Sequence, residues 1–262
     1  MNILDQIIAV KREEVEARKQ LISIDDLKSS PYFTRSCLSL KNRLLASPGI
    51  ISEFKRKSPS KGWIHEDADV VEITSGYSAA GAAGISILTD TKYFGGVQQE
   101  LTAARPHVDC PVLRKDFMID EYQIYEAKSI GADLILLIAA ALTPSESLKL
   151  ARKAKELGLE VLLEVHTREE LAYCSDDVDL VGVNNRNLKT FEVSTQLSED
   201  LAPLIPDRFV KISESGLSDV RTVKMLIDKG YRGFLMGENF MKEKDPAEAL
   251  RKFDASLREV ES

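Results

Sequence analysis

Short apolar runs rich in Val, Ile and Leu recur along the chain, and amphipathic helical patterns separate them. Eight of the runs have the length of a strand, and they lie at about 50–55, 84–89, 111–116, 133–138, 160–165, 179–184, 209–214 and 232–237. The clearest helical patterns between them cover 69–82, 121–131, 144–158 and 217–230. Apolar strands that alternate with helices are typical of a parallel sheet built from β/α units.

The number of runs distinguishes between the parallel folds. Eight β/α units within about 210 residues match a (β/α)₈ TIM barrel better than a doubly wound sheet, which usually has fewer strands and a switch point. We expect residues 1–48 to form an N-terminal helical extension of a single domain that spans 1–262, since no linker interrupts the pattern. The apolar positions of its first helix have helical spacing: Ile3, Ile7, Val10 and Val15.

Composition and charge exclude several classes of protein. Hydrophobic residues make up 44% of the chain, which is enough for a sizeable core. The net charge of −7 argues against a general nucleic-acid binder, which needs a basic surface to neutralise phosphates. The longest apolar run, 134–142, is shorter than a transmembrane span, and the charged N-terminus does not fit a signal peptide. We therefore expect a soluble protein that binds neither nucleic acid nor membranes.

The sequence gives little support to metal, disulfide or nucleotide chemistry. Cys37, Cys110 and Cys174 are far apart and outside any C-x-x-C spacing, so we expect neither a disulfide nor a zinc site, in a reducing cytoplasm. The three histidines lack metal-ligand spacing. His166 follows a strand end and could touch the site, but we expect it to lie at the surface. No P-loop and no G-x-G-x-x-G follows a strand, so no nucleotide cofactor is indicated.

Charged residues stand where the barrel strands end. Side chains alternate between inward and outward along a strand, and catalytic residues of TIM barrels gather at the carboxyl ends of the strands. This alternation directs seven polar side chains toward one mouth: Glu53, Lys55, Lys115, Glu164, Asn184, Arg186 and Glu214. Each could be an ordinary strand-end ion pair, but buried charge is costly unless it is paired, and converging acids and bases suit acid–base catalysis. The pattern favours an enzyme.

Two further stretches predict a site for an anion. "SESG" (213–216) follows the seventh strand and "LMGE" (235–238) follows the eighth, where TIM barrels commonly bind phosphate. Gly216 and Gly237 allow the backbone N–H groups to approach an anion closely. The basic segment "EFKRKSPSKG" (53–62), a local concentration of charge in an acidic protein, also points to a small anionic ligand.

Six segments together resemble a known family. "SEFKRKSPSKG", "VLRKDFMIDEYQIYEA", "LLEVHT", "VGVNNRNL", "ISESG" and "FLMGENFM" resemble, in order and over essentially the whole chain, the indole-3-glycerol phosphate synthases of tryptophan biosynthesis. The resemblance implies a lyase that closes the ring of 1-(2-carboxyphenylamino)-1-deoxyribulose 5-phosphate and releases indole-3-glycerol phosphate, CO₂ and water. It implies no metal and no organic cofactor. The partners expected are the phosphorylated substrate and other enzymes of the tryptophan pathway.

The resemblance also implies roles for individual residues. Lys115 matches the general acid that protonates the substrate ketone, and Glu164 and Glu53 match the carboxylates used in dehydration. Asn184 and Arg186 match positions that bind the substrate and order these carboxylates, and Glu214 matches a further carboxylate. The remaining matches are substrate-binding positions: Lys55, Ser58, Phe94, Phe117, Leu136, Ser215, Gly216, Gly237 and Glu238. Within that set, Phe94, Phe117 and Leu136 correspond to an apolar pocket for the anthraniloyl ring.

Glu238 departs from the family pattern. Many relatives carry Ser or Thr here, whose hydroxyl donates to phosphate, whereas a carboxylate would repel phosphate. We expect the Glu238 side chain to turn away, and we expect Arg56, Lys57 and Lys61 to be structural or solvated. Two alternatives stay open: another phosphate-sugar barrel enzyme such as phosphoribosylanthranilate isomerase, whose motifs and shorter length are not found, and a barrel that has lost catalysis.

Overall fold

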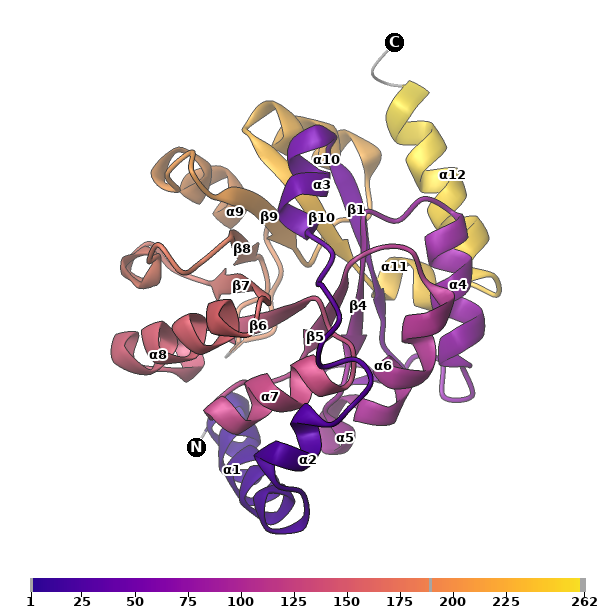
Figure 1. The fold of residues 1–262 in the computed structure, drawn as a ribbon. Coiled ribbons are helices and arrows are strands. Elements are labelled where there is room, and N and C mark those ends of the chain that lie inside the picture. The colour runs from indigo at the N-terminus through magenta and orange to yellow at the C-terminus, as the bar shows by residue number, and fades with distance from the viewer. Residues whose placement is uncertain (1, 189, 260–262) are drawn as a thin grey trace.

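The chain forms a closed barrel of eight parallel strands (Figure 1). The computed structural model describes residues 2–188 and 190–259, so Met1, residue 189 and residues 260–262 of the expected domain lie outside it. Around the barrel the strands are β1 (Gly49–Phe54), β10 (Tyr231–Met236), β9 (Val210–Glu214), β8 (Leu180–Asn184), β7 (Glu160–Val165), β6 (Leu134–Ile138), β5 (Val112–Lys115) and β4 (Gly84–Leu88). Each strand boundary lies within one residue of its prediction, and the TIM barrel is confirmed.

Helices cover the outside of the barrel. They are α4 (Val70–Ala79), α5 (Thr91–Phe94), α6 (Gln98–Ala104), α7 (Glu121–Ser129), α8 (Pro144–Glu156), α9 (Gln196–Leu201), α10 (Val220–Asp228), α11 (Glu238–Met241) and α12 (Pro246–Glu259), with short 3₁₀ segments η1 (Arg105–His107), η2 (Ala139–Ala141), η3 (Glu169–Tyr173) and η4 (Ala202–Leu204). α8 shows which local interactions determine where a helix begins and ends. Thr143 and Glu146 form a capping box around Pro144 at its start, and Gly158, at φ +74°, follows its end.

Two apolar layers hold the barrel together. Inside the barrel, residues such as Ile51, Leu113 and Leu162 are fully buried, and a second layer packs between the strands and the helices. Leu40 and Leu44 of α3 (Leu40–Ala46) belong to the inner layer, so the N-terminal extension closes the amino-terminal end of the barrel. The opposite end, where the strands finish, is left for the site.

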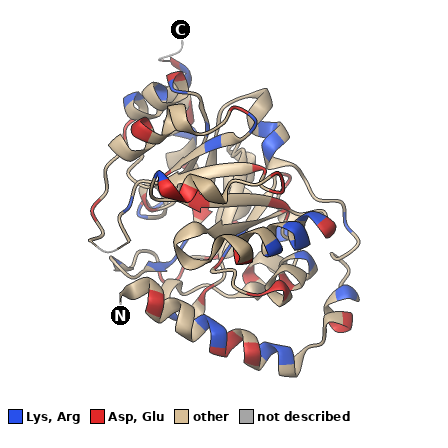
Figure 2. Cartoon of the chain, turned by 90° about the vertical axis from the view of Figure 1, so that its left-hand side faces the viewer, with Lys and Arg blue, Asp and Glu red and all other residues tan. Residues whose placement is uncertain are grey.

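The N-terminal extension also contains α1 (Ile3–Leu21) and α2 (Ile24–Lys28). Of the apolar positions expected on one face of α1, Ile7 and Val15 are buried, whereas Ile3 and Val10 are only partly covered. Lys11 shares the buried face, which the sequence pattern did not indicate. Figure 2 shows basic and acidic residues alternating along α1. Among the described residues, no helix is both long and apolar enough to span a membrane.

A small hairpin lies between β1 and α4, within the basic segment. Its strands are β2 (Lys57–Ser58) and β3 (Gly62–Trp63), paired antiparallel. Trp63 packs against Gly95 so closely that a Cβ atom on Gly95 would lie 2.9 Å from the indole ring. The ammonium of Lys57 lies 5.3 Å from the centre of the same ring. The hairpin is thus fixed to the loop that follows α5.

Candidate active site

The carboxyl ends of the strands surround a cavity of about 670 Å³. Every residue that the sequence indicated for the site lines it, from Glu53 near the end of β1 to Glu238 after β10. Because parallel strands end at the same edge of a barrel, positions distant in sequence meet here. The hairpin β2–β3 and the start of α1 complete the wall, with Ile3, Leu4 and Ile7.

Lys115 occupies the centre of the polar part of the cavity. Its Nζ lies 2.9 Å from Glu214 Oε2, 3.6 Å from Glu53 Oε2 and 3.8 Å from Glu164 Oε2. These carboxylates come from β9, β1 and β7, and all three are almost fully buried. Lys55 lies on the outer side of Glu53, with its Nζ 2.8 Å from Oε1. The arrangement therefore combines two ammonium groups with three carboxylates.

This charge balance sets the protonation of the site. Burial alone would lower the pKa of Lys115, but the charges of Glu214, Glu53 and Glu164 outweigh it and hold that pKa above its ordinary value. Burial raises the pKa of Glu214 to about 7, although Lys115 opposes the rise. Burial also acts on Glu164, but His166 and Lys115 outweigh it and hold its pKa well below the usual range. Near neutral pH, Glu164 is ionised while Glu214 exchanges a proton.

His166 lies beside Glu164, so the expectation that it is a surface residue is wrong. Its Nε2 is 3.2 Å from Glu164 Oε1, its Nδ1 is 3.6 Å from Glu170 Oε2, and its side chain is 10% exposed. Burial would lower the pKa of His166, but the two carboxylates raise it to about 10, so the imidazole is charged. Asn184 donates from Nδ2 to the same Glu164 oxygen at 3.1 Å. Glu164 is held from two sides.

One part of the cavity is apolar and aromatic. The rings of Phe94 and Phe117 lie with their centres 6.1 Å apart at an interplanar angle of 39°, and both line the cavity. Leu136, which is buried on β6, and Ile7 of α1 line the cavity as well. A planar aromatic group suits this wall, as the resemblance implied.

The loops after β9 and β10 form the other part of the cavity. Ser215 and Gly216 both have a left-handed backbone, with φ of 66° and 75°. The Ser215 hydroxyl donates to Asn184 Oδ1 at 2.9 Å, which ties this loop to β8. At Gly237 a Cβ atom would lie 2.7 Å from Glu53 Oε1, so only glycine fits beside that carboxylate.

The position of Glu238 differs from expectation. Its side chain was expected to turn away, but Glu238 lines the cavity and its carboxylate lies 3.8 Å from Lys61 Nζ, across from the hairpin. Lys61 was expected to be structural or solvated; its side chain is half exposed, and it lines the cavity as well. The physical reason is that the hairpin brings a cation opposite a carboxylate that would otherwise be unpaired. Arg56, in contrast, pairs with Glu100 outside the cavity and is structural.

Arg186 and Ser58 line the cavity with different contacts. The Arg186 backbone N–H donates to Asn184 Oδ1, and its guanidinium donates to the Phe191 carbonyl at 3.4 Å. Within residues 2–188 and 190–259 it forms no ion pair with a carboxylate, so of the two residues expected to order the carboxylates only Asn184 does so, by its bond to Glu164. Ser58 is buried, and its Oγ accepts from the Lys61 N–H at 3.2 Å.

The cavity also contains residues that the sequence did not single out. Asn239 and Lys242 follow β10, and Leu188, Phe191 and Val193 follow β8. They lie in loops or, for Asn239, in the short helix α11, where the alternation along a strand gives no direction. In the part of the chain that the structure describes, no three His, Cys, Asp or Glu residues are grouped as a metal site would require.

Comparisons with known proteins identify the family of the chain. A family model described as indole-3-glycerol phosphate synthase matches residues 4–253. A relative from Bacteroides thetaiotaomicron with that name is 52% identical over 253 residues, covering 96% of this chain and 97% of the relative, and one from Kineococcus radiotolerans is 42% identical, covering 95% and 94%. Among solved structures, KGPDC from Streptococcus mutans shares the fold with a TM-score of 0.62 at 15% identity, over 82% of this chain and all of that one. The chain belongs to the indole-3-glycerol phosphate synthase family.

Proposed function

We propose that this chain closes the indole ring of 1-(2-carboxyphenylamino)-1-deoxyribulose 5-phosphate with Lys115 as the general acid. The family assignment carries the reaction, which is that of a carboxy-lyase. The observation that carries the role of Lys115 is its position among three buried carboxylates from three strands, 2.9–3.8 Å away. An ammonium held in this way stays charged until a reacting oxygen needs its proton.

The first bond forms between the aryl carbon that bears the carboxylate and the ketone carbon. Negative charge develops on the ketone oxygen, and Lys115 transfers a proton to it, which gives a hydroxyl. Loss of CO₂ leaves its electron pair in the ring and restores aromaticity. Glu214 then returns a proton to the neutral amine of Lys115, because its pKa of about 7 lies below that of the ammonium.

Dehydration completes the indole. Glu164 takes the proton lost from the carbon next to nitrogen, since its low pKa keeps it ionised and His166 and Asn184 hold it in place. Lys115 gives its proton to the departing hydroxyl, which leaves as water. Glu53 lies between Lys55 and Lys115 and keeps both ammonium groups oriented. The steps use only protein side chains.

The two ends of the substrate fit the two parts of the cavity. Phe94, Phe117 and Leu136 would hold the aryl ring. Ser215, Gly216, Gly237 and the N–H of Glu238 would bind the phosphate, and Lys55, Ser58 and Arg186 would contact its anionic groups. We also propose that residues 1–262 act as one domain in the cytoplasm, because the family is biosynthetic and the three cysteines are free. Enzymes that supply its substrate or consume its product are the expected partners.

The activity is tested by mixing purified protein with the carboxyphenylamino substrate. Indole fluorescence should appear with time, in proportion to the protein added. A folded protein that gives no signal with intact substrate would refute the synthase assignment. Conversion of phosphoribosylanthranilate into the carboxyphenylamino compound, with the carboxylate retained, would instead favour the isomerase alternative.

Lys115→Met tests the general acid. The substitution keeps the volume and removes the proton, so kcat should fall by about 10²–10⁴-fold, the usual contribution of general acid–base groups. Lys211→Met is the matched control, since it removes a similarly buried strand lysine that donates to the Ala202 carbonyl outside the cavity. Stopped-flow or steady-state fluorescence gives kcat, and circular dichroism checks the fold. A near wild-type kcat in Lys115→Met would exclude Lys115 from this role.

A further inference from the structure

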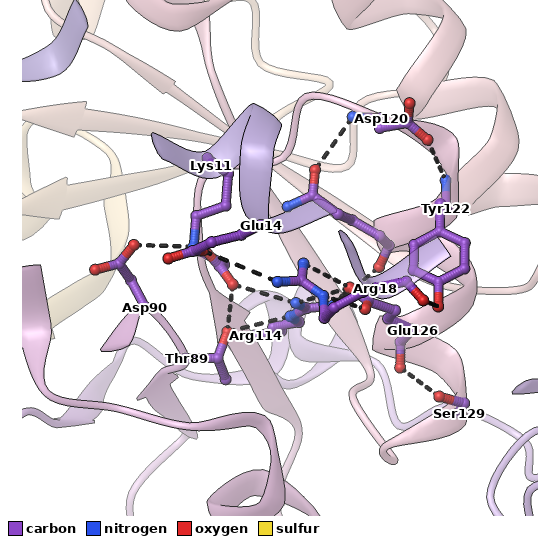
Figure 3. Close-up of polar contacts among 12 residues, drawn as sticks. Lys11, Glu14, Arg18, Thr89, Asp90, Arg114, Asp120, Tyr122, Glu126 and Ser129 are labelled. Atoms are coloured by element: carbon purple, nitrogen blue, oxygen red, sulfur yellow. Dashed lines mark hydrogen bonds and ion pairs between the residues drawn. The ribbon is translucent and has the colours of Figure 1, made fainter. Parts of the chain in front are cut away.

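Lys11 of α1 is a buried cation at the back of the aromatic wall. Its side chain is 1% exposed, and its Nζ lies 2.9 Å from Asp90 Oδ2, 3.0 Å from Asp116 Oδ1 and 2.8 Å from Glu14 Oε2 (Figure 3). Asp90 and Asp116 are themselves 1% exposed. A buried cluster of one ammonium and several carboxylates is stable only while its charges stay paired, so the positions of these side chains are tightly determined.

Each of the two aspartates also holds the backbone beside one aromatic residue. Asp90 Oδ1 accepts the Tyr93 N–H at 2.8 Å, which caps the short helix α5 that ends at Phe94. Asp116 Oδ1 accepts the Phe117 N–H, also at 2.8 Å. The two segments that carry the rings are therefore joined through one ammonium.

A second bond connects the same segments. The Thr89 hydroxyl donates to Asp116 Oδ2 at 2.7 Å, and Arg114 contacts that oxygen at 3.2 Å. The carboxylate of Asp116 is thus fixed independently of α1, whereas Asp90 depends on Lys11 for its charge balance. Loss of Lys11 would free the Asp90 side of the wall first.

Other contacts already fix α1 to the barrel. Farther along the helix, Arg18 pairs with Glu126 at 2.6 Å (Figure 3). Lys19 pairs with Asp120 at 2.7 Å. Tyr122 donates from its hydroxyl to the Arg18 carbonyl at 3.2 Å. Docking of α1 therefore does not require Lys11. What distinguishes Lys11 is that two of its partners, Asp90 and Asp116, hold the backbone beside Phe94 and Phe117, and Asp116 itself lines the cavity.

We infer that Lys11 is a positioning residue that sets the spacing of Phe94 and Phe117 and thereby the fit of the slot for the aryl ring of the substrate. The inference rests on the proposed function, which assigns the aryl ring to this wall. The ammonium of Lys11 pairs with carboxylates and not with either ring. It acts through the two aspartates, so its effect concerns aryl binding and leaves the phosphate end and the chemical step unaffected.

Lys11→Met tests the inference, with Lys19→Met as the control on the same helix. The probes are 2-aminobenzoate for the aryl end and inorganic phosphate for the other end, each as a competitive inhibitor. In Lys11→Met, the KM and the inhibition constant of 2-aminobenzoate should rise about tenfold, with kcat and the phosphate constant within about twofold. Lys19→Met should leave KM, kcat and both inhibition constants unchanged. An equal rise for both probes, or the same result in Lys19→Met, would overturn the inference.

A charge-balanced variant covers the case in which Lys11→Met does not fold. Lys11→Met/Asp90→Asn removes one charge of each sign, Asp116 keeps Arg114, and the Asn carbonyl can still accept the Tyr93 N–H. The same selective loss of 2-aminobenzoate affinity is expected, and unchanged affinity refutes the role of Lys11. Wild-type protein that forms no indole product would refute the proposed function instead, so the two failures can be told apart.

Discussion

At the level of single residues, Glu214 differs from its neighbours because it exchanges a proton near neutral pH. Glu53, Glu164 and Glu214 are all buried around Lys115, but one ammonium at this distance cannot balance three carboxylates. Lys55 neutralises Glu53, and His166 neutralises Glu164. Glu214 is left as the carboxylate with the least compensation, and burial raises its pKa to about 7.

We expect KM to increase as the pH rises through 7. Glu214 loses its proton there, and a new negative charge then faces an anionic substrate. Screened repulsion across the cavity corresponds to about a two- to fivefold change. Glu214→Gln stays neutral at every pH and should lack this step, which also separates it from the titration of the substrate phosphate. A step of equal size in both proteins, measured between pH 6 and 8, would assign it to the substrate.

Glu238→Ser should lower KM by about two- to fivefold at low ionic strength, with kcat nearly unchanged. The substitution removes a negative charge from the expected phosphate end and releases Lys61, whose Nζ lies 3.8 Å from the carboxylate. The effect should shrink as salt is added, because both groups are partly exposed. Glu238→Ser/Lys61→Met is the control, in which most of the gain should be lost. A higher KM in Glu238→Ser would mean that the pair positions the hairpin for binding.

The alternation of side chains along strands predicts the central residues of the site, and it extends one step beyond the end of β7. His166 stands two positions after Glu164 and so shares its inward direction, which was a usable signal for its place in the site. Lys61 could not be predicted in this way, because a hairpin determines its direction. The pairing of Lys61 with Glu238 depends on how the hairpin lies relative to the end of β10, which the sequence does not show.

At the level of elements, all eight strands could be predicted because both of their faces are buried, which gives continuous apolar runs. Helix ends and the small hairpin β2–β3 were harder to predict from the sequence, since they depend on caps, glycines and contacts with other segments. The buried face of α1 was predicted only in part. An apolar repeat describes packing but does not reveal that Lys11 meets two carboxylates 79 and 105 positions away, at Asp90 and Asp116.

β8 contributes a glycine, Gly182, whose missing side chain leaves room for Glu214. A Cβ atom on Gly182 would lie 2.5 Å from Glu214 Oε1, so Gly182→Ala should push that carboxylate away from Lys115. We expect kcat to fall by about 10–100-fold, because small displacements of catalytic groups are costly. Val183→Ala, on the outward face of the same strand, is the control: it should lower thermal stability and leave kcat nearly intact. Wild-type kcat in a folded Gly182→Ala protein would contradict this account.

At the level of the whole molecule, α1 and α3 close the barrel from two sides. α3 fills the amino-terminal end with Leu40 and Leu44, while α1 joins the opposite end through charged groups. Because α1 is attached here through ion pairs with carboxylates, protonation of those carboxylates at low pH should weaken this part of the fold. Burial would raise the pKa of Asp116, but Lys11 and Arg114 outweigh it and lower the pKa to about 2.

Asp116 should therefore contribute to acid unfolding. Its carboxylate pKa is lower in the folded chain than in the unfolded one, so the stabilisation is fully present above about pH 4 and is lost as the pH falls through about 2. Between pH 5 and pH 3 this loss amounts to about 1 kcal/mol. Asp116→Asn should be less stable at pH 7, and its difference from wild type should narrow by that amount over the same range. Urea unfolding at each pH measures the free energy of unfolding of wild type and of Asp116→Asn. A difference between the two that does not change with pH would contradict the prediction.

The packing of Trp63 on Gly95 has a spectroscopic consequence. The chain contains one tryptophan, so light that excites only tryptophan reports on a single place, the hairpin at the rim of the cavity. Trp63 is 49% exposed and its indole ring lies beside the Lys57 ammonium, an environment that changes if the hairpin moves. The protein thus carries its own optical label at the entrance of the site, and hairpin motion can be followed in the unmodified chain without an attached dye.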